Sequence, residues 1–503
     1  MRYTLVSPRL AVQKGDFLGS GVPYWPLELA MLAGCVRERG DEVTVIDSFG
    51  ASPTTFEERK DHYLQGAPLE RWRASAEVRD AQVFVVFAIS VMSHADSLDI
   101  VRRLRRWRPD ARVLVLENSQ AVTAYALLTV QGDFFGAGAD VLLRGEILTS
   151  WDGIADWLRD GGEPPDGVVL QNRAVGRRAT RATLPRLPLP AWDLFPIEQY
   201  WALPYAHGPK VDRYLPVLTS FGCPYPCAFC VAPETTGRRW QGRAAEEVVE
   251  EWVSLRDRYG VRHFQVEDLN PTIQAARWRS IAARLIEDGA DVTFAFASGT
   301  KAETIPLDDV AQLACAGLNY LSISPESGSK SVRSAIGKRF DHEHGLGLVE
   351  RCRMHGVATQ ACFLVGYPGE TDADHRQSVE YLRALVRAGL DEVAIFVVAP
   401  LPGSKLFGEG QLELKDDGAL VSFSPKGRSD WRQVSARRRA LIRVFFGEKL
   451  RSGSEIWKSV LRATVGHPRT KMENLPRRVA FVASRLAALQ ARKLLPSPGR
   501  GQK

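Results

Sequence analysis

The 503-residue chain is poor in sulfur-containing residues, with seven cysteines and five methionines. An odd number of cysteines in a chain of this size argues against a disulfide framework. A secretory leader is not expected, because the residues after Met1 do not form a charged segment followed by an apolar run. No apolar run approaches the roughly eighteen residues needed to span a bilayer. We therefore expect a reducing, cytoplasmic setting.

Three of the cysteines, Cys223, Cys227 and Cys230, lie close together with C-x3-C-x2-C spacing. A short loop with this spacing can wrap one face of an iron–sulfur cluster, and three thiolates leave one iron of a [4Fe–4S] cube open to a small molecule. Structural zinc is disfavoured because no fourth Cys or His follows at finger or ribbon spacing. Buried apolar packing is the expected role of the other cysteines, which are Cys35, Cys315, Cys352 and Cys362. For Cys362, inside an apolar strand, a place on the inward face that borders the ligand cavity is the alternative.

The cysteine motif resembles that of the radical S-adenosylmethionine (SAM) enzymes, which have an aromatic residue just before the last cysteine, as Phe229 is here. Four further segments are similar to family motifs and follow in the family's order: FQVEDLN (264–270), SPESG (324–328), GYPGET (366–371) and PLPGS (400–404). Five ordered motifs over about two hundred residues are improbable by chance. The resemblance implies a [4Fe–4S] cluster and SAM as cofactors.

The resemblance also implies that the three cysteines hold the cluster and that six residues contact SAM: Phe229, Glu267, Asp268, Ser298, Glu326 and Gly366. Phe229 and the backbone near Gly366 would approach the adenine. Glu267 or Asp268 would accept hydrogen bonds from the cationic amino group. Ser298 and Glu326 would contact the carboxylate and the ribose of SAM. For Glu326, a helix-capping role remains the alternative, because carboxylates are stabilised at helix N-termini.

Between residues 215 and 400, short apolar runs alternate with helical periods, which predicts βα units around a parallel sheet. We predict six strands, at residues 216–220, 263–266, 293–297, 320–324, 359–365 and 392–398. Thr371 and Asp374 form a variant capping box for a helix over 371–388. Six units are fewer than a closed eightfold barrel needs, so we expect a partial (β/α)6 barrel with ligands at the carboxyl ends of its strands.

The N-terminal region predicts a second α/β domain. Five strand signals, at residues 3–6, 43–46, 83–88, 113–116 and 140–143, are separated by amphipathic stretches. This alternation indicates a flavodoxin-like, doubly wound sheet. We place the boundaries at 1–165 for this domain, 166–214 for a linker, 215–420 for the barrel, 421–495 for a basic helical region and 496–503 for a disordered tail.

Residues 26–29, 40–47, 138–146 and 187–194 resemble the cobalamin-binding domain and linker of one radical SAM subclass, in which the corrinoid lies between the two domains. This resemblance implies cobalamin contacts from Ser7, Asp47, Ser90, Asn118, Ser119, Gly145 and Glu146. The chain departs from the pattern in two ways. No Asp-x-His-x-x-Gly follows the first strand, and Asn118 and Ser119 stand where the family has paired glycines, which narrows the predicted tail pocket. A flavodoxin-like domain without corrinoid is the alternative.

Acidic residues are scarce at the C-terminal end. Residues 421–503 hold twenty Lys and Arg against four Asp and Glu, so the rest of a chain of net charge +7 carries about −9. Helical patterns over 432–451, 456–465 and 475–494 have an apolar stripe opposite basic residues. A helical cap over the barrel is favoured, with an acidic-ligand surface or membrane-surface contact of 477–495 as alternatives. Sparse aromatic interleaving argues against nucleic acid.

These features together predict a cobalamin-dependent radical SAM C-methyltransferase that acts on a small biosynthetic intermediate. A radical oxidative cyclase or rearranging enzyme of the same architecture is the alternative, and a non-catalytic corrinoid- or cluster-binding protein is a third hypothesis. A methylthiotransferase is disfavoured because the first domain contains only Cys35. The family implies a flavodoxin- or ferredoxin-type reductant, which the basic C-terminal surface would attract. Trp25, Tyr205 and Tyr225 are candidates for either the substrate pocket or packing.

Overall fold

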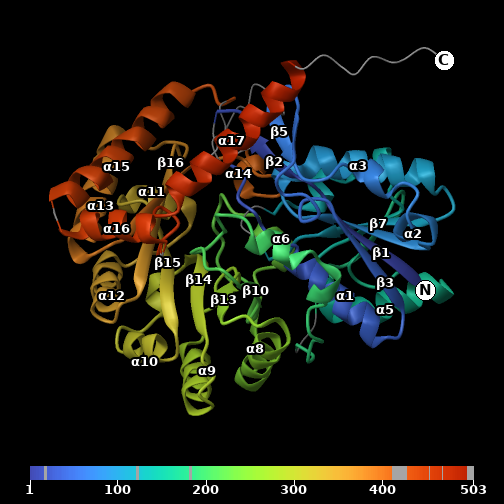
Figure 1. Ribbon diagram of the computed structural model, residues 1–503, viewed down its shortest axis with the longest axis horizontal. Coiled ribbons are helices and arrows are strands. Elements are labelled where there is room, and N and C mark those ends of the chain that lie inside the picture. The colour runs from blue at the N-terminus through green and yellow to red at the C-terminus, as the bar shows by residue number, and fades with distance from the viewer. Residues whose placement is uncertain are drawn as a thin grey trace.

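The computed structural model describes residues 1–15, 20–120, 124–180, 184–410, 427–451, 454–466 and 468–494. Two parallel sheets lie side by side, each flanked by helices, and the C-terminal helices cover one side of the second sheet (Figure 1). One hydrophobic core cluster contains residues of both units and of the C-terminal helices. The two sheets therefore share a continuous packed core.

The N-terminal sheet has the strand order β3-β1-β6-β7-β8-β9. Its strands are β1 (Arg2–Ser7), β3 (Glu42–Asp47), β6 (Val83–Ala88), β7 (Arg112–Glu117), β8 (Val141–Leu143) and β9 (Val168–Leu170). The first five are parallel, in the order 2-1-3-4-5 of flavodoxin-like folds, whereas β9 runs antiparallel to β8. Every residue of β6 is buried, because helices cover both faces of the sheet. The predicted flavodoxin-like sheet is confirmed.

Helices connect these strands: α1 (Leu27–Glu38), α2 (Ala76–Arg79), α3 (His94–Trp107), α4 (Gln131–Ala137) and α5 (Ile147–Asp160), with 3-10 turns η1 (Leu69–Trp72), η2 (Val91–Ser93) and η3 (Leu127–Val130). A small antiparallel sheet, β2-β5-β4, was not predicted. Its strands, β2 (Leu10–Gln13), β4 (Phe56–Glu58) and β5 (His62–Gln65), have three or four residues each. Strands this short give too little alternation for a sequence signal.

The second sheet contains six parallel strands in chain order: β10 (Leu215–Val217), β13 (His263–Val266), β14 (Thr293–Thr300), β15 (Leu318–Glu326), β16 (Ala358–Val365) and β17 (Glu392–Val397). Strands β10 and β17 are its two edges, so the barrel is partial, as predicted. The first predicted strand is too long, because the chain leaves the sheet after Val217 and forms the hairpin of β11 (Ser220–Gly222) and β12 (Trp240–Gly242).

The helices of this unit are α7 (Ala232–Thr236), α8 (Ala245–Tyr259), α9 (Ala275–Glu287), α10 (Asp309–Cys315), α11 (Lys330–Ile336), α12 (His342–Met354), α13 (Asp372–Ala388) and α14 (Lys405–Gly408), with η5 (Ala302–Thr304). The capping box of α13 is confirmed. Thr371 Oγ1 accepts a hydrogen bond from the Asp374 amide at 3.2 Å, and the Asp374 carboxylate accepts one from the Thr371 amide at 2.9 Å.

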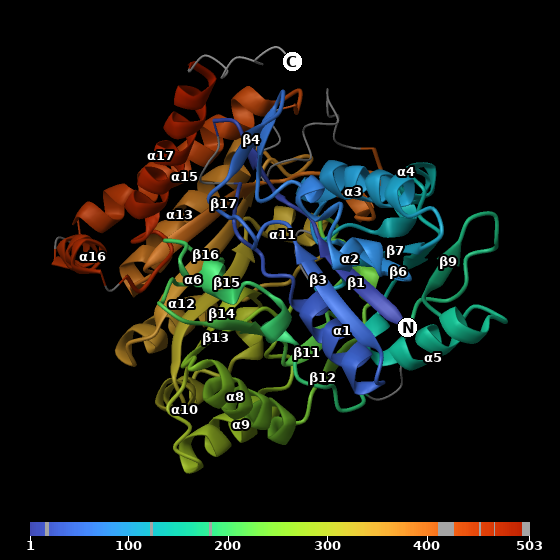
Figure 2. The ribbon, with the colours of Figure 1, turned by 45° about the vertical axis from the view of Figure 1, so that its right-hand side comes forward.

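The segment between the sheets packs the two units together. Strand β9 lies inside the predicted linker but pairs with β8, at the outer edge of the N-terminal sheet (Figure 2). Next come η4 (Trp192–Leu194) and α6 (Ile197–Trp201). The Trp25 ring stacks on Tyr200 with ring centroids 4.2 Å apart, and its Nε1 donates to the Tyr214 hydroxyl at 3.1 Å. Trp25 is therefore mainly a packing residue between the units.

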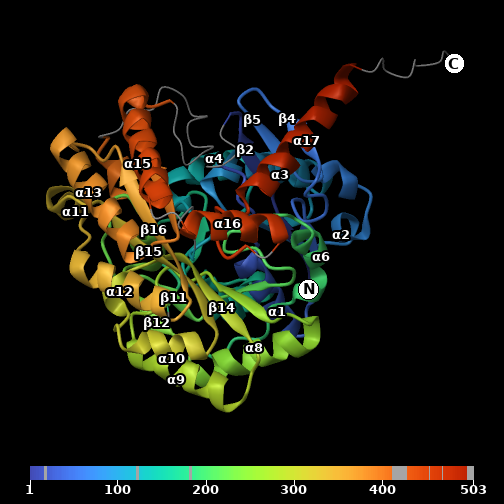
Figure 3. The same cartoon turned by 60° about the vertical axis from the view of Figure 1, so that its left-hand side comes forward.

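The three predicted C-terminal helices are confirmed as α15 (Trp431–Arg451), α16 (Ser454–Val465) and α17 (Leu475–Leu494). Helix α15 packs on α13 and β17, and α17 reaches back to β4 (Figure 3). The predicted barrel boundary at 420 and the predicted disordered tail, 496–503, lie outside the described residues. In the described part of the chain, none of the helices is long and apolar enough to cross a bilayer.

Candidate active site

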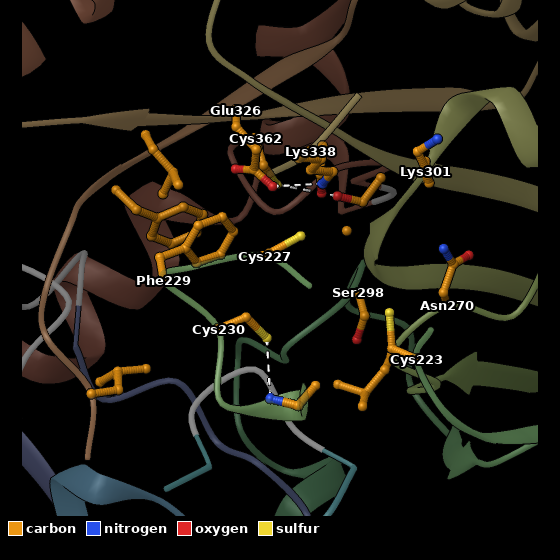
Figure 4. Close-up of a pocket in the computed structure, with 18 of the residues that line it drawn as sticks. Cys223, Cys227, Phe229, Cys230, Asn270, Ser298, Lys301, Glu326, Lys338 and Cys362 are labelled. Carbon is orange, nitrogen blue, oxygen red and sulfur yellow. Dashed lines mark hydrogen bonds and ion pairs between the residues drawn. The ribbon is translucent and has the colours of Figure 1, made fainter. Parts of the chain in front are cut away.

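A cavity with about 1450 Å³ of empty space, including its opening to solvent, lies where the two sheets and the C-terminal segment meet. The N-terminal unit contributes Tyr24, Val91 and Met92 to its wall, and His207 comes from the linker. The barrel contributes the cysteine loop and the inner ends of its strands (Figure 4). The cavity is thus at the carboxyl edge of the parallel sheet, where α/β folds bind their ligands.

The predicted cluster cysteines all line this cavity (Figure 4). Burial raises the pKa of Cys227 to about 11 and that of Cys230 to about 12, so these thiols ionise only with a compensating positive charge such as iron. Three thiolates bind three different irons of a cube, so their sulfur atoms need not converge on one point. Accordingly, no three His, Cys, Asp or Glu side chains of the described residues are arranged to hold one metal ion.

The cysteine loop begins with a glycine that the geometry requires. Gly222 has φ +78°, and a Cβ atom there would lie 2.1 Å from the Arg239 carbonyl oxygen. Its amide donates to Gln120 Oε1 at 3.0 Å, and Gln120 comes from the loop after β7. A side chain of the N-terminal unit therefore positions the start of the cluster loop, which the sequence motif did not reveal.

Glu326 faces the cavity in an ion pair. Its Oε1 lies 2.7 Å from Lys338 Nζ, and both side chains are less than 10% exposed. Burial alone would lower the pKa of Lys338, but the neighbouring carboxylate raises it above its ordinary value. Glu326 itself has φ +63°, a strained conformation for a residue other than glycine. The capping alternative is wrong, since Ser329 caps α11, and the predicted SAM contact of Glu326 stays a prediction.

The two acidic residues after β13 differ in their surroundings. Asp268 is fully buried, and its carboxylate accepts hydrogen bonds from the Thr219 amide and hydroxyl, both at 2.7 Å, and from Ser220 Oγ at 2.5 Å. Glu267 lies 2.7 Å from His207 Nδ1 and lines a smaller adjoining cavity of about 560 Å³ of empty space. Asp268 thus links β13 to the segment after β10, whereas Glu267 faces a cavity; a SAM contact by either residue stays a prediction.

The remaining predicted SAM residues differ in whether they line the main cavity. Phe229 and Ser298 line the main cavity, and Ser298 Oγ donates to Glu267 Oε2 at 3.3 Å. Gly366 does not line it: its amide donates to Glu370 Oε2 at 2.7 Å, and a Cβ atom there would meet Val434 of α15 at 2.7 Å. A direct adenine contact by Gly366 stays a prediction.

Three of the predicted cobalamin residues line cavities next to the main one. Ser7 and Ser90 border one of about 310 Å³ of empty space, and Asn118 borders the one next to Glu267. Ser119 donates from its amide and hydroxyl to the buried Glu28 carboxylate, at 2.9 and 2.7 Å. The other residues are bound or buried within the domain: Asp47 accepts from the Gly50 amide and the Tyr200 hydroxyl, the Gly145 amide donates to Glu117, and Glu146 is buried.

The Glu28 carboxylate is expected to make stability depend on pH. Burial raises its pKa from 4.5 to about 7, so the folded state binds this proton more tightly and loses stability as pH rises from about 4.5 to 7. Glu28→Gln removes this loss, which amounts to about 3 kcal/mol at most. We therefore expect the difference in Tm between the variant and wild type to be more positive at pH 8 than at pH 5. The control Glu246→Gln, at an exposed carboxylate, should not show this rise in the Tm difference between pH 5 and pH 8. An equal rise in the control would contradict the assignment of the pH dependence to Glu28.

Several cavity residues were not found from the sequence. They are Tyr24, His207, Asn270, Lys301, Lys338 and Lys471. Asn270 stands two residues after the acidic pair, a position that the strand-end argument could have included. The others lie outside the motifs. The Lys301 ammonium lies 4.9 Å from the centroid of the Tyr225 ring, and both residues line the main cavity. Tyr225 is thus a cavity residue, whereas Tyr205 is buried against Arg478 and Gln65.

Residues 217–382, which contain the cysteine loop and most of the barrel, match the family model of the radical SAM superfamily. The chain therefore contains a radical SAM domain. A [4Fe–4S] cluster and SAM are therefore its cofactors, held by a domain of the predicted type. The matched range includes Cys223, Cys227, Cys230 and Glu326, and it ends within α13.

Curated relatives of the chain include an uncharacterised methyltransferase of Pyrococcus horikoshii, 25% identical over 53% of this chain and 57% of the relative. Another is the cytidylyl-2-hydroxyethylphosphonate methyltransferase of Streptomyces wedmorensis, 27% identical over 45% of this chain and 43% of the relative. The chain thus spans about half the length of these curated relatives.

Two solved structures share the fold over most of the chain. The radical SAM methyltransferase TsrM of Kitasatospora setae, with tryptophan and a SAM analogue bound, has a TM-score of 0.60 and 17% identity, covering 81% of this chain and 76% of TsrM. The cobalamin-dependent radical SAM enzyme OxsB, with aqua-cobalamin bound, has a TM-score of 0.59 and 14% identity, covering 85% of this chain and 56% of OxsB. At this identity, the likeness shows a common fold.

Proposed function

We propose that the protein is a cobalamin-dependent radical SAM C-methyltransferase that acts on a small biosynthetic intermediate. The observation that carries the proposal is the shared cavity: the cluster cysteines lie on its barrel side, and Tyr24, Val91 and Met92 of the flavodoxin-like unit lie on the other. The named methyltransferases and cobalamin-dependent enzymes with related sequences or folds support the same assignment.

The chain's own residues fit these cofactors. The three thiols supply the donors that a [4Fe–4S] cluster needs. Two smaller hollows share Tyr24 with the main cavity: one lies between the units next to Asn118, and one lies within the N-terminal unit next to Ser7 and Ser90. These hollows would receive parts of a corrinoid that extend beyond the main cavity. When bound, the cluster with SAM supplies a 5′-deoxyadenosyl radical, and cobalamin supplies a transferable methyl group.

The protein's part in this reaction is to bind, orient and exclude water. The Glu267 carboxylate, held by His207 and Ser298, would accept the SAM amino group, and Phe229 would lie along the adenine. The apolar wall formed by Val91, Met92 and Leu269 keeps water from the reacting groups. Alignment of the substrate carbon between the two cofactors would supply most of the rate advantage.

A radical oxidative cyclase or rearranging enzyme of the same architecture remains the second candidate, favoured by the loop at Asn118 and Ser119. Both residues are already hydrogen-bonded within the domain, to Ile89 and Glu28, where the subclass has glycines. The reductant, a flavodoxin or ferredoxin, and the absence of nucleic acid from its partners stay predictions.

The deciding experiment measures bound corrinoid and the products of SAM. We would purify the protein without oxygen from cells supplied with cobalamin, reconstitute the cluster and determine corrinoid per chain by absorption. About one corrinoid per chain is expected, with S-adenosylhomocysteine formed beside 5′-deoxyadenosine once substrate is present. An intact cluster without corrinoid would instead assign the protein to the second candidate. Bound corrinoid and an intact cluster without any SAM cleavage would indicate a binding protein.

A further inference from the structure

The main cavity continues from the cluster loop down the inside of the barrel. Along β16, Gln360, Cys362 and Leu364 line it, and along β15, Ser322, Ser324 and Glu326 do so. Alternate residues of a strand point to the same face, so each set marks one inward-facing row. With a rise of about 3.3 Å per residue, Glu326 and Ser322 are about 13 Å apart along the strand. The cavity is therefore deep, with the cysteines at its upper end.

The floor of the cavity is a network built on Glu392, at the start of β17. The Glu392 carboxylate accepts hydrogen bonds from the Tyr320 hydroxyl, from Gln360 Nε2 at 2.6 Å and from the Met472 amide at 2.9 Å. Gln360 Oε1 in turn accepts from Ser322 Oγ at 2.9 Å. Because these donors enclose the carboxylate and it is fully buried, Glu392 does not present its charge to the cavity.

The segment before α17 closes the floor and contributes Lys471 to the cavity wall. The bond from the Met472 amide to Glu392 fixes the position of this segment. The Lys471 ammonium lies 5.7 Å from the centroid of the Tyr320 ring. Burial raises the pKa of Cys362 and the charge of Lys471 acts in the opposite direction, so the ammonium is within electrostatic reach of the cavity-facing thiol.

The other cavity cations have anionic neighbours. Lys338 is paired with Glu326 at 2.7 Å, and Lys301 lies 3.7 Å from Glu303 Oε2. By contrast, within the described ranges no carboxylate oxygen lies within 4.0 Å of Lys471 Nζ. The nearest anionic group on the floor is Glu392, and the charge of Lys471 opposes the rise that burial causes in the pKa of Glu392. Three hydrogen-bond donors already occupy this carboxylate, so Lys471 is a positive charge without a direct ion pair at the end of the cavity remote from the cysteines.

We propose that Lys471 and the Gln360 amide bind an anionic group, a carboxylate or a phosphate, at the far end of an elongated substrate. The inference rests on the proposed function, because it takes the main cavity as the substrate site. The substrate then spans the barrel, with its reacting carbon near the cysteines and its anionic end on the floor. The C-terminal segment thereby determines specificity as well as covering the barrel.

Cys362 provides a reporter that needs neither turnover nor corrinoid. Protein with its cluster intact is treated with iodoacetate or with neutral iodoacetamide, and alkylation rates at Cys362 are measured by mass spectrometry. The exposed Cys315 gives the intrinsic ratio of the two reagents. In wild type, we expect the ratio of the iodoacetate rate to the iodoacetamide rate to be about tenfold higher at Cys362 than at Cys315. Lys471→Met should abolish this preference of Cys362 for iodoacetate. The matched control Lys330→Met removes an exposed lysine of α11 and should leave it unchanged.

A second measurement tests binding and distinguishes the two anions. Cys362 is protected from iodoacetamide with 4-phenylbutyrate, with its amide, or with 3-phenylpropyl phosphate. Either anion should protect at about tenfold lower concentration than the amide in wild type, and no better than the amide in Lys471→Met. The better protector identifies the preferred group.

Equal protection by anions and amide in wild type, or an unchanged iodoacetate preference in Lys471→Met, would overturn the proposal. Iron content per chain shows whether Lys471→Met has folded. If it has not, Lys471→Gln replaces it, and Lys471→Arg should keep the preference. Absence of corrinoid would refute the proposed function without changing these alkylation results, so the two failures are distinguishable.

Discussion

Replacing Cys227 by alanine is expected to remove the iron–sulfur cluster and to lower 5′-deoxyadenosine formation by at least about a thousandfold. With two thiolates left, the cluster has no ligand at a second iron, and Cys223 and Cys230 lie on a single short loop with no other thiol of a known cluster motif nearby in the chain. Iron content, absorption of the anaerobic protein and 5′-deoxyadenosine on reduction are the measurements.

The matched control for this variant is Cys315→Ala. Cys315 is exposed at the end of α10 and away from the cavity wall, so its loss should change neither iron content nor SAM cleavage. If Cys227→Ala retained a full cluster and normal SAM cleavage, the assignment of the cluster ligands would be wrong. If Cys315→Ala lost the cluster, the effect of either substitution would reflect general destabilisation.

Replacing Lys338 by methionine is expected to destabilise the protein strongly. The substitution leaves the Glu326 carboxylate buried without its cation, and breaking a buried ion pair from one side costs about 3–5 kcal/mol. For a barrel of this size, this loss corresponds to a Tm lower by about 10 °C. Thermal unfolding of the anaerobically purified protein, followed by circular dichroism, measures the change.

The double variant Lys338→Met/Glu326→Gln distinguishes two causes of destabilisation, the loss of the ion pair and the loss of side-chain packing at Lys338. With the carboxylate neutralised, no buried charge remains unpaired, so the double variant should recover most of the lost stability. A double variant as unstable as Lys338→Met would show that the methylene chain of Lys338, and not its charge, stabilises the barrel. Because the pair lies beside the cysteines and Glu326 is also a predicted SAM contact, iron content of the double variant, and not SAM cleavage, reports how far the two charges support the cluster.

The fold could be predicted from the sequence because its signals are local. Most parallel strands of the two sheets are short apolar runs followed by a helical period, and β6 is a continuous run of apolar residues. The three cysteines lie within eight residues, so their spacing alone indicates a cluster loop. The capping box of α13 is equally local. The hairpin of β11 and β12 was missed because its strands of three residues carry no periodic signal.

The amino-acid sequence by itself determined the two α/β units, the radical SAM motifs and the three candidate cluster cysteines, since each depends on residues close together in the chain. The tertiary structure alone decided which polar residues reach the cavity. Asp268 accepts a hydrogen bond from Thr219, whereas Glu267 lies beside His207, although Glu267 and Asp268 are neighbours in the chain. The tertiary structure also brought Lys471 against strands more than seventy residues earlier. Such contacts depend on the packing of distant segments, for which the chain has no local signal.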